Sequence, residues 1–576
     1  MTYPRLCFLT CCFGLLCLTS CQSIQPSQSN DQRPNILIVL VDDMGFSDPA
    51  CFGGEIQTPH LDRLAQNGLR FTQFYNAGRC CPTRASLLTG LYPHQAGIGQ
   101  MTRDQGEEFP GYRGRLMENT LTIAEALGAA GYQTAMVGKW HASLTPVKGG
   151  KGDSEEHMRW LNHQGYAEDD FGDVSTYPTA RGFDKYFGNI WGVVNYFDPF
   201  SLVNGTEPVK EVPDDFYLTD AISDTAVSYI DAFAQSEKPF FLYVAHCAPH
   251  WPLHALPEDI AKYKDTYREG WDAIREQRFA RQQQMGLWGS SRIQLSQAAN
   301  RSHQWEDEPN QAWEAGAMAV HAAMIDRVDQ GLGRILHKLE TLGELDNTLI
   351  MFLSDNGASP ERYGKPGFDR NSETRDGQQV HYVDPELMAG PETSYMYIGQ
   401  TWANVANTPF RYWKARTFEG GVCTPFVAHW PAGISEPAGS IKDQPAHIID
   451  LMATCLDVSG TQYPQRFEGR TITPLEGQSL RPLFEGEAKE TDRQLLFEHF
   501  HAKAFRWGDW KLVAYPHHPW ELYNLKEDRT ELNNLADQMP EKVEEMAALW
   551  QQKAEDTFVF PQWNNRKPDK LPEQAY

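Results

Sequence analysis

The chain has 576 residues, 41% of them hydrophobic, and a formal net charge of −25 at pH 7. This length suffices for one large domain with a smaller one attached, or for two to three domains. The acidic balance, with no long basic run, excludes nucleic acid and anionic lipid surfaces as expected partners of the protein body. An anionic small substrate stays compatible if a local cluster of cations opposes the overall field.

The N-terminal residues 1–20 are predicted to be a targeting segment. Arg5 precedes an apolar stretch, residues 6–18, that is too short to span a bilayer. The sequence LTSC, which ends at Cys21, resembles a bacterial lipoprotein signal; this implies that Cys21 is lipidated and begins the mature chain. An ordinary cleaved signal peptide is the alternative. Either way we expect an exported protein, and the resemblance implies a lipid anchor in a bacterial cell envelope (periplasm or outer membrane), with residues 21–33 as a linker.

Four continuous apolar runs follow along the chain, and each is closed by polar residues. They are NILIVLVDD (35–43), YQTAMVGKWH (132–141), KPFFLYVAHCAPH (238–250) and NTLIMFLSDNG (347–357). Such runs are typical of strands buried in a parallel sheet. Segments with helical apolar spacing alternate with them: 121–131, 220–234 and 315–343. The alternation predicts an α/β domain over residues 34–485, with a mixed, mostly parallel central sheet flanked by helices. We expect the four polar clusters to converge beyond the carboxyl ends of the strands.

Long polar insertions and a change of pattern complete the chain. Residues 142–179 are rich in Gly and charge, and residues 265–309 are rich in Gln, with an exposed helix expected near 269–286. Near the C-terminus, short apolar runs with turn signals lead into an amphipathic helix over 540–555. This predicts a small α+β subdomain over residues 486–576.

Three carboxylates and one amide stand at the ends of two predicted strands: Asp42, Asp43, Asp355 and Asn356. Hard oxygen donors of this kind suit Ca²⁺ or Mg²⁺ rather than zinc. Two adjacent acidic residues alone are more often capping or surface groups. The second pair, at another strand end, strengthens the interpretation of these residues as a metal site. The 11 cysteines include no C-x-x-C pair, which disfavours a zinc ribbon or a redox motif; a single disulfide stays open.

Two adjacent cysteines precede a proline in RCCPTRASLLTG, residues 79–90. From the residues alone they could be a disulfide, a metal site, a reactive thiol or two small core residues. Only Cys80 fits the frame Cys-x-Pro-x-Arg-x-x-x-Leu-Thr-Gly, with Pro82 and Arg84. This frame resembles the signature of the sulfatases. The resemblance implies that a formylglycine-generating or anaerobic maturation enzyme converts Cys80 to formylglycine (3-oxoalanine), whereas Cys81 occupies the variable position.

Three further segments resemble the same family. GKWH brings Lys139 and His141, APHWPLH brings His250, and FRYWKARTFEGGV brings Lys414. Other residues of the same types lie outside the matching frames: His246, His254, Lys148, Lys151 and Lys365. The match runs from about residue 33 to 551 and is nearest to bacterial arylsulfatases, which implies an alkaline-phosphatase-like fold.

The resemblance also implies a role for each matching residue. Formylglycine at Cys80 is the nucleophile and a metal ligand, and Arg84 orients its diol. The cation, Ca²⁺ in preference to Mg²⁺, is held by four further residues: Asp42, Asp43, Asp355 and Asn356. Lys139 binds sulfate, and His141 is the base that collapses the hemiacetal. His250, together with Lys414, protonates or stabilises the leaving oxygen.

The implied reaction is hydrolysis of a sulfate monoester, from an aryl sulfate or a sulfated carbohydrate. A phosphonate or phosphate ester hydrolase of the same superfamily is the alternative, but such enzymes tend to carry Asp-His where this chain has Asp355-Asn356. A glycan-binding lipoprotein with a dead sulfatase fold is the other alternative. We expect substrate choice to come from loops at the pocket rim. These are residues 142–179, 192–204, 265–309 and 359–407.

Overall fold

The computed structural model describes residues 1, 33–164, 171–289, 291–297, 303–487 and 492–562. The part of the chain that begins at Arg33 forms one compact unit. The targeting segment, the linker and Cys21 lie outside the described residues, so what the sequence predicts for them stays a prediction. No helix among the described residues is long and apolar enough to cross a membrane.

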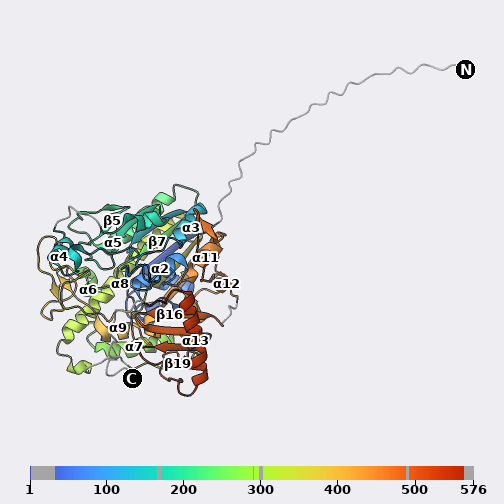
Figure 1. The fold of residues 1–576 in the computed structure, drawn as a ribbon. Helices are drawn as coiled ribbons and strands as arrows, with labels where there is room; N and C mark the ends of the chain where they lie inside the picture. The colour runs from blue at the N-terminus through green and yellow to red at the C-terminus, as the bar shows by residue number, and fades with distance from the viewer. Residues whose placement is uncertain (2–32, 165–170, 290, 298–302, 488–491, 563–576) are drawn as a thin grey trace. The chain divides into compact units, whose positions relative to one another are not determined.

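An extended sheet runs through the centre of this unit (Figure 1). Its strand order is β12-β2-β11-β8-β1-β7-β3-β4-β5-β6, and β13 also pairs with β2. The strands are β1 (Asn35–Val41), β2 (Leu69–Tyr75), β3 (Gln133–Gly138), β4 (Lys185–Asn189), β5 (Leu202–Asn204), β6 (Glu207–Pro208), β7 (Phe240–Ala245), β8 (Thr348–Ser354), β11 (Cys423–His429), β12 (Ser440–Lys442) and β13 (Ala446–His447). The four strands predicted from the sequence are its central neighbours β8, β1, β7 and β3, and they pair in parallel.

The buried strands send alternate residues into two separate cores. In β1, Leu37, Val39 and Val41 pack on one side with α5 (Leu218–Phe233) and α8 (Gln311–Leu342). Ile36, Ile38 and Leu40 pack on the other side with α2 (Cys80–Thr89), α3 (Ile123–Ala129) and α11 (Asp450–Ser459). A strand that is buried on both faces needs apolar residues at every position, which is why these runs are continuous. The predicted fold class is thereby confirmed.

The remaining helices and short strands belong to the connections between these elements. The helices are α1 (Pro59–Asn67), α4 (Glu155–Leu161), α6 (Pro257–Tyr263), α7 (Gly270–Gln284), α9 (Gly399–Ala406), α10 (Glu419–Val422) and α12 (Arg481–Phe484). The short strands are β9 (His381–Tyr382), β10 (Ser394–Tyr395), β14 (Arg466–Phe467) and β15 (Arg470–Thr471). Helix α7 matches the helix predicted over 269–286, but it is not simply exposed, because Arg278 on one of its faces is buried against Asp48 and Glu55.

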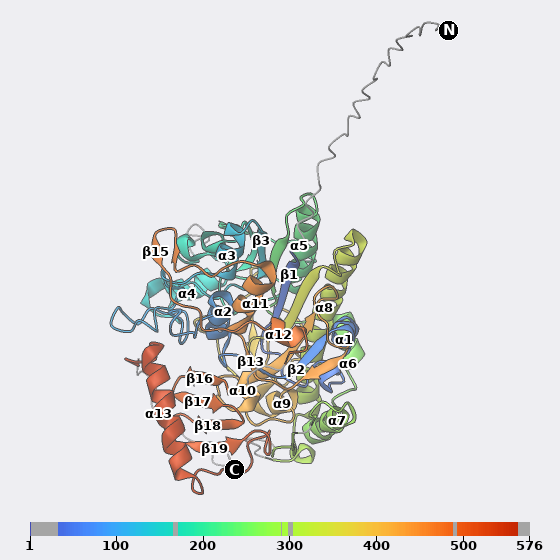
Figure 2. The ribbon, with the colours of Figure 1, turned by 90° about the vertical axis from the view of Figure 1, so that its right-hand side faces the viewer.

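Near the C-terminus, four antiparallel strands form a separate sheet, and helix α13 (Pro540–Asp556) lies along it (Figure 2). The strands are β16 (Gln494–His499), β17 (Ala502–Trp507), β18 (Trp510–Ala514) and β19 (Glu521–Asn524). This is the α+β subdomain expected from the short apolar runs. The boundary between residues 485 and 486 stays a prediction.

A buried cluster of charges joins this sheet to helix α10. The Nζ atom of Lys511 lies 2.7 Å from Glu419 Oε1 and 2.8 Å from Glu531 Oε1, and Arg529 also pairs with Glu419. All four side chains are buried. A buried charge is tolerated when it is paired, and removing one partner leaves the other uncompensated.

Glu419→Gln is therefore expected to lower the free energy of unfolding by about 3 kcal/mol, because Lys511 and Arg529 lose a buried counter-charge. Denaturation in urea, followed by tryptophan fluorescence, measures the change. Glu545→Gln is the matched control, because Glu545 is half exposed in its pair with Lys542 and should contribute less than about 1 kcal/mol. Equal shifts of the two midpoints would contradict this account of the cluster.

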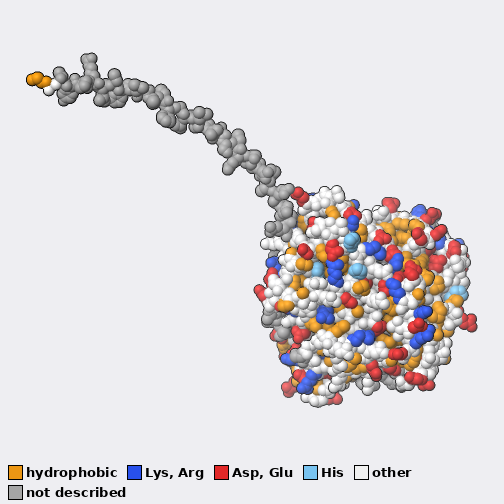
Figure 3. Space-filling model, turned by 180° about the vertical axis from the view of Figure 1, so that it is seen from behind, with side chains coloured by type: hydrophobic (Ala, Val, Ile, Leu, Met, Phe, Trp, Pro, Cys, Tyr) orange, Lys and Arg blue, Asp and Glu red, His pale blue; other side chains and the backbone are white. Residues whose placement is uncertain are grey.

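The surface carries charges of both signs. On the face seen in Figure 3, acidic and basic side chains are interspersed with apolar ones. We therefore expect the cations that oppose the overall charge of −25 near a substrate to lie inside the molecule rather than on this face.

Candidate active site

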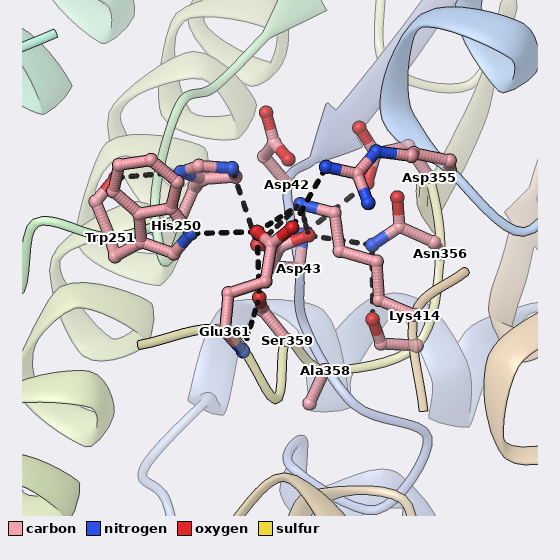
Figure 4. A network of polar contacts seen from close by, with 12 residues as sticks. Asp42, Asp43, His250, Trp251, Asp355, Asn356, Ala358, Ser359, Glu361 and Lys414 are labelled. Carbon is pink, nitrogen blue, oxygen red and sulfur yellow. Dashed lines mark hydrogen bonds and ion pairs between the residues drawn. The ribbon is translucent and has the colours of Figure 1, made fainter. Parts of the chain in front are cut away.

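The carboxyl ends of the four central strands bring the predicted polar clusters together. Asp42 and Asp43 follow β1, and Asp355 and Asn356 follow β8. Lys139 and His141 follow β3, and His250 lies in the loop after β7. Because parallel neighbours end at the same edge of a sheet, these residues meet there. Figure 4 shows the members that follow β1, β7 and β8.

The acidic residues form a compact, buried group. Asn356 donates from Nδ2 to Asp43 Oδ1 at 2.6 Å, and the Asp43 amide donates to Asp355 Oδ1 at 3.3 Å. Asp43 adopts a left-handed backbone conformation with a φ of 68°, which is uncommon outside glycine and occurs at functional sites. Among the described residues, Asp42 Oδ1 and Asn356 Oδ1 are buried without a hydrogen-bond donor. Two such orphaned oxygens beside two further carboxylates are the donor set that a hard divalent cation fits.

Three buried cations face these carboxylates. Arg84 donates from Nη2 to Asp42 at 3.1 Å and to Asp355 at 3.0 Å. Lys139 pairs with Asp42, and the Nζ atom of Lys414 lies 2.8 Å from Asp43 Oδ1. Burial raises the pKa of the Asp42 carboxyl, but the charges of Lys139, His250 and Arg84 outweigh this and lower it overall. This is the local cationic cluster that an anionic substrate requires in an acidic protein.

Helix α2 begins at Cys80, so the thiol lies at a helix N-terminus. The neighbouring Cys81 thiol and the charges of Lys139, His141 and Lys414 lower the pKa of Cys80 well below its ordinary value, against the opposing effect of burial. Cys81 itself is fully buried, and its Sγ donates to the Gln100 carbonyl at 3.2 Å. Burial raises the pKa of Cys81. The two neighbours thus have different environments, and Cys80 is the one that lines the cavity.

The two predicted histidines are held in fixed orientations. The Nδ1 atom of His250 lies 2.6 Å from the Trp251 carbonyl, and its Nε2 atom lies 3.4 Å from Asp43 Oδ2. His141 lies beside Cys80, and Gly192 packs so closely on its ring that a Cβ atom at Gly192 would overlap it. Burial lowers the pKa of both imidazoles, and for His250 the carboxylates of Asp43 and Asp42 oppose this effect.

The alternative residues of the same types lie away from the cavity. His254 binds the Ser394 carbonyl at 3.0 Å through Nε2, and His246 is buried, with its pKa lowered to about 3 by burial. None of the three alternative lysines lines the cavity: Lys148, Lys151 and Lys365. The six cysteines of the described residues are free and buried, so they form no disulfide: Cys51, Cys80, Cys81, Cys247, Cys423 and Cys455.

A cavity of about 190 Å³ opens above Cys80, His141, His250 and Lys414. Its walls are largely aromatic and apolar: Met101, Trp191, Val193, Trp251, Tyr363, Phe368 and Phe500. Three of the predicted rim loops contribute to it. None of the described residues of the segment 265–309 lines the cavity, contrary to that expectation. Helix α7, in this segment, packs instead against the loop that carries Asp48 and Glu55.

The sequence interpretation missed five lining elements. They are the segment 100–105, Trp191, Phe500 from the C-terminal subdomain, Arg79 and the specific side chain Glu361. Arg79 directly precedes Cys80 in the motif, which was an available signal. The others stand in segments without a motif, and their approach to the cavity depends on how distant parts of the chain pack.

Comparison with known proteins places these observations in a family. A model described as Sulfatase matches residues 34–461, and one described as N-sulphoglucosamine sulphohydrolase, C-terminal, matches residues 410–557. The chain is 32% identical over 562 residues to an uncharacterized sulfatase of Schizosaccharomyces pombe, covering 91% of this chain and 94% of that relative. It is also 32% identical over 454 residues to an arylsulfatase of Klebsiella aerogenes, covering 78% of this chain and 92% of the relative.

A solved structure supports the same fold. The crystal structure of Ps i-CgsB in complex with k-i-k-neocarrahexaose matches with a TM-score of 0.63 at 24% identity, covering 93% of this chain and 95% of that chain. Together with the family match over residues 34–461, the two relatives at 32% identity show that this chain belongs to the sulfatase family and is a sulfuric ester hydrolase.

Proposed function

We propose that this enzyme hydrolyses sulfate monoesters by means of a formylglycine made from Cys80, beside a Ca²⁺ ion held by Asp42, Asp43, Asp355, Asn356 and residue 80. One observation carries the proposal. Cys80 lines the cavity at the start of α2, within a group of buried cations and next to buried oxygens that have no donor. Neither two core cysteines nor a disulfide accounts for that environment.

The cation and the formylglycine would each contribute to the reaction. A bound cation polarises a sulfate oxygen and lowers the pKa of a hydroxyl at residue 80, and the hydrated aldehyde provides that hydroxyl as the nucleophile. The donor set supports Ca²⁺ over zinc, because it consists of carboxylate and amide oxygens. It does not by itself separate Ca²⁺ from Mg²⁺, so the experiment includes both.

The buried cations are suited to bind and stabilise sulfate. Negative charge builds on the leaving oxygen as its bond to sulfur breaks, and fixed positive groups in a site shielded from water stabilise that charge strongly. Lys139 and Lys414 provide two ammonium groups, and both are buried. Arg84 bridges Asp42 and Asp355, so it also fixes the carboxylates at the edge of the sheet.

The histidines are suited to move protons. The Trp251 carbonyl at 2.6 Å from Nδ1 favours the tautomer with its proton on that atom. His250 can then deliver a proton to a leaving oxygen from Nε2 only as the imidazolium. His141, beside residue 80, is suited to accept the proton of a hydroxyl at that residue.

The substrate is proposed to be an aryl sulfate or a sulfated carbohydrate. The aromatic walls of the cavity suit a flat ring or the apolar face of a sugar. Relatives support both classes: the arylsulfatase of Klebsiella aerogenes, and an N-acetylglucosamine-6-O-sulfatase of Bacteroides thetaiotaomicron that is 25% identical over 588 residues. We also propose, from the N-terminal sequence alone, that the enzyme is exported and lipid-anchored through Cys21.

The test is hydrolysis of 4-nitrocatechol sulfate and of a panel of sulfated sugars by protein produced with its maturation enzyme. We expect release of sulfate that EDTA abolishes and Ca²⁺ or Mg²⁺ restores. Matched phosphate and phosphonate esters should react more slowly. No sulfate release from any aryl or sugar sulfate would overturn the proposal. Peptide mass across Thr83 tests the nucleophile, because unmodified Cys80 in a fully active preparation would contradict it.

Gly192→Ala should lower kcat by about 100-fold, because the added methyl group displaces the His141 ring from residue 80. The KM for the aryl sulfate should change less. Gly364→Ala is the matched control, since Gly364 likewise has no positive φ and nothing lies within 4 Å of a Cβ atom there. If both variants retain wild-type kcat, the orientation of His141 does not limit the reaction.

A further inference from the structure

Glu361 occupies a special position in the wall of the cavity. Its side chain is only 14% exposed, and in Figure 4 its carboxylate lies between the His250–Trp251 segment and Lys414. Oε1 accepts from Arg79 Nη2 at 2.8 Å, and Oε2 accepts from Trp251 Nε1 at 3.0 Å. The Nζ atom of Lys414 lies 3.7 Å from Oε2.

These contacts connect four segments that are far apart in the chain. Arg79 is the residue before Cys80 at the start of α2, and Trp251 directly follows His250. Lys414 lies in the loop before α10, and Glu361 itself lies five residues after Asn356. Two local hydroxyls, those of Ser359 and Tyr363, donate to the same carboxylate at 3.3 Å. This half-buried carboxylate thus contacts three segments that bring proposed reacting groups to the cavity: the start of α2, the loop after β7 and the loop before α10.

Lys414 lies between two carboxylates, those of Asp43 and Glu361. Asp43 is also one of the oxygen ligands proposed for the cation. A cation bound to the oxygens of Asp43 weakens the attraction of Asp43 for Lys414. Glu361 then supplies the counter-charge that keeps the buried ammonium in the cavity wall. Burial alone would raise the pKa of Glu361, but the charges of Arg79, Lys414 and His250 hold it well below its ordinary value, so the carboxylate is ionised.

We propose that Glu361 is a positioning residue, whose carboxylate holds the Lys414 ammonium and the His250–Trp251 segment against the sulfate-binding end of the cavity. The proposal rests on the proposed function, because it assigns Lys414 and His250 to the sulfate ester. It extends that function to a residue outside the family signatures, and it predicts which step Glu361 affects. A merely structural Glu361 would stabilise the fold and leave sulfate binding unchanged.

The first experiment compares Glu361→Gln with wild type in the Ca²⁺-loaded, matured enzyme. Glu361→Gln removes the negative charge that faces Lys414 in an ion pair shielded from water, and this loss should lower kcat by about 30-fold, while KM for 4-nitrocatechol sulfate changes by less than about threefold. Affinity for inorganic sulfate, measured by calorimetry without turnover, should fall by about tenfold. Glu361→Asp, which keeps the charge on a shorter stem, should recover part of both losses.

Glu155→Gln is the matched control for charge, because Glu155 is exposed on α4 and does not line the cavity. It should leave kcat and sulfate affinity at wild-type values. If Glu361→Gln also leaves sulfate affinity unchanged, or if it lowers only the unfolding midpoint, the positioning role is refuted.

The second experiment is a double-mutant cycle with Lys414→Met. If Glu361 acts through Lys414, adding Glu361→Gln to the Lys414→Met variant should lower sulfate affinity by less than about threefold further. If the two substitutions instead lower sulfate affinity by independent factors that multiply, the proposal is overturned. Should Glu361→Gln fold poorly because the largely covered Arg79 loses its counter-charge, the double variant Arg79→Gln/Glu361→Gln removes both charges. Its unfolding midpoint should recover, whereas its sulfate affinity should stay low.

The sulfate-binding readout separates this proposal from the proposed function. A wild-type protein that binds sulfate but hydrolyses no ester would defeat the proposed function, and the effect of Glu361→Gln on sulfate affinity would still decide the role of Glu361. A wild-type enzyme that hydrolyses esters while Glu361→Gln matches it in kcat and sulfate affinity would defeat this inference alone.

Discussion

Cys80→Ser is expected to lower kcat for sulfate-ester hydrolysis by at least about 1000-fold, even though its hydroxyl occupies the start of α2 among the same cations. A serine could attack sulfur once, but its own sulfate ester would then require attack by water. A hydrated aldehyde carries a second hydroxyl on the same carbon, and loss of its proton can expel sulfate without water as nucleophile. The expected result is therefore a protein that reacts once, rather than one that does not react.

Mass spectrometry distinguishes these outcomes. After incubation with 4-nitrocatechol sulfate, the Cys80→Ser peptide should gain the mass of one sulfate group, while Cys80→Ala should gain nothing. Cys81→Ala is the matched control, because Cys81 is buried beneath the cavity and donates to the Gln100 carbonyl. Once its conversion at Cys80 is verified by mass, this variant should retain sulfate release. Sustained turnover by Cys80→Ser would show that the second hydroxyl is not needed.

The residues at the carboxyl edge of the sheet were predictable because the pattern that marks them is local in the sequence. Each central strand is a continuous apolar run, and a polar group that directly follows such a run must lie at the strand's carboxyl end. Asp42, Lys139 and Asp355 could therefore be assigned to one site without knowing the order of the strands. The order itself, with the antiparallel β11 between β2 and β8, depends on long-range packing and leaves no comparable local pattern.

The residues that were missed are those whose position depends on loops. Glu361 lies in a segment with no regular periodicity, and nothing near it in sequence reveals that Arg79, Trp251 and Lys414 surround it. Phe500 reaches the cavity from the C-terminal subdomain, and the segment 100–105 reaches it from a long connection after α2. For the same reason the polar character of residues 265–309 was a misleading signal, since a polar insertion can pack against the body of the domain as well as at the rim.

Removal of the divalent cation is the second large effect that we expect. Asp42, Asp43 and Asp355 pair with Arg84, Lys139 and Lys414, so a cation bound to these carboxylates would weaken the pairs and free the ammonium groups for a sulfate. Treatment with EDTA should therefore lower kcat/KM by at least about 100-fold, because the Lewis acid is removed and the lysines are no longer free to bind sulfate. Ca²⁺ or Mg²⁺ should restore activity, and zinc should not restore it, because the donors are oxygens.

Asp355→Asn tests whether these carboxylates hold the cation. The amide has nearly the same shape, but one negative charge is lost, so the dissociation constant for Ca²⁺ should rise by about 100-fold, measured by calorimetry on the EDTA-treated protein. Asp224→Asn removes the same charge at an exposed position, where the carboxylate is 64% exposed, and should leave Ca²⁺ binding unchanged. Equal affinities in the wild type and Asp355→Asn would place the cation elsewhere. A lowered affinity with activity that saturating Ca²⁺ restores would instead assign Asp355 to holding the ion, and leave the chemistry to residue 80, the lysines and the histidines around it.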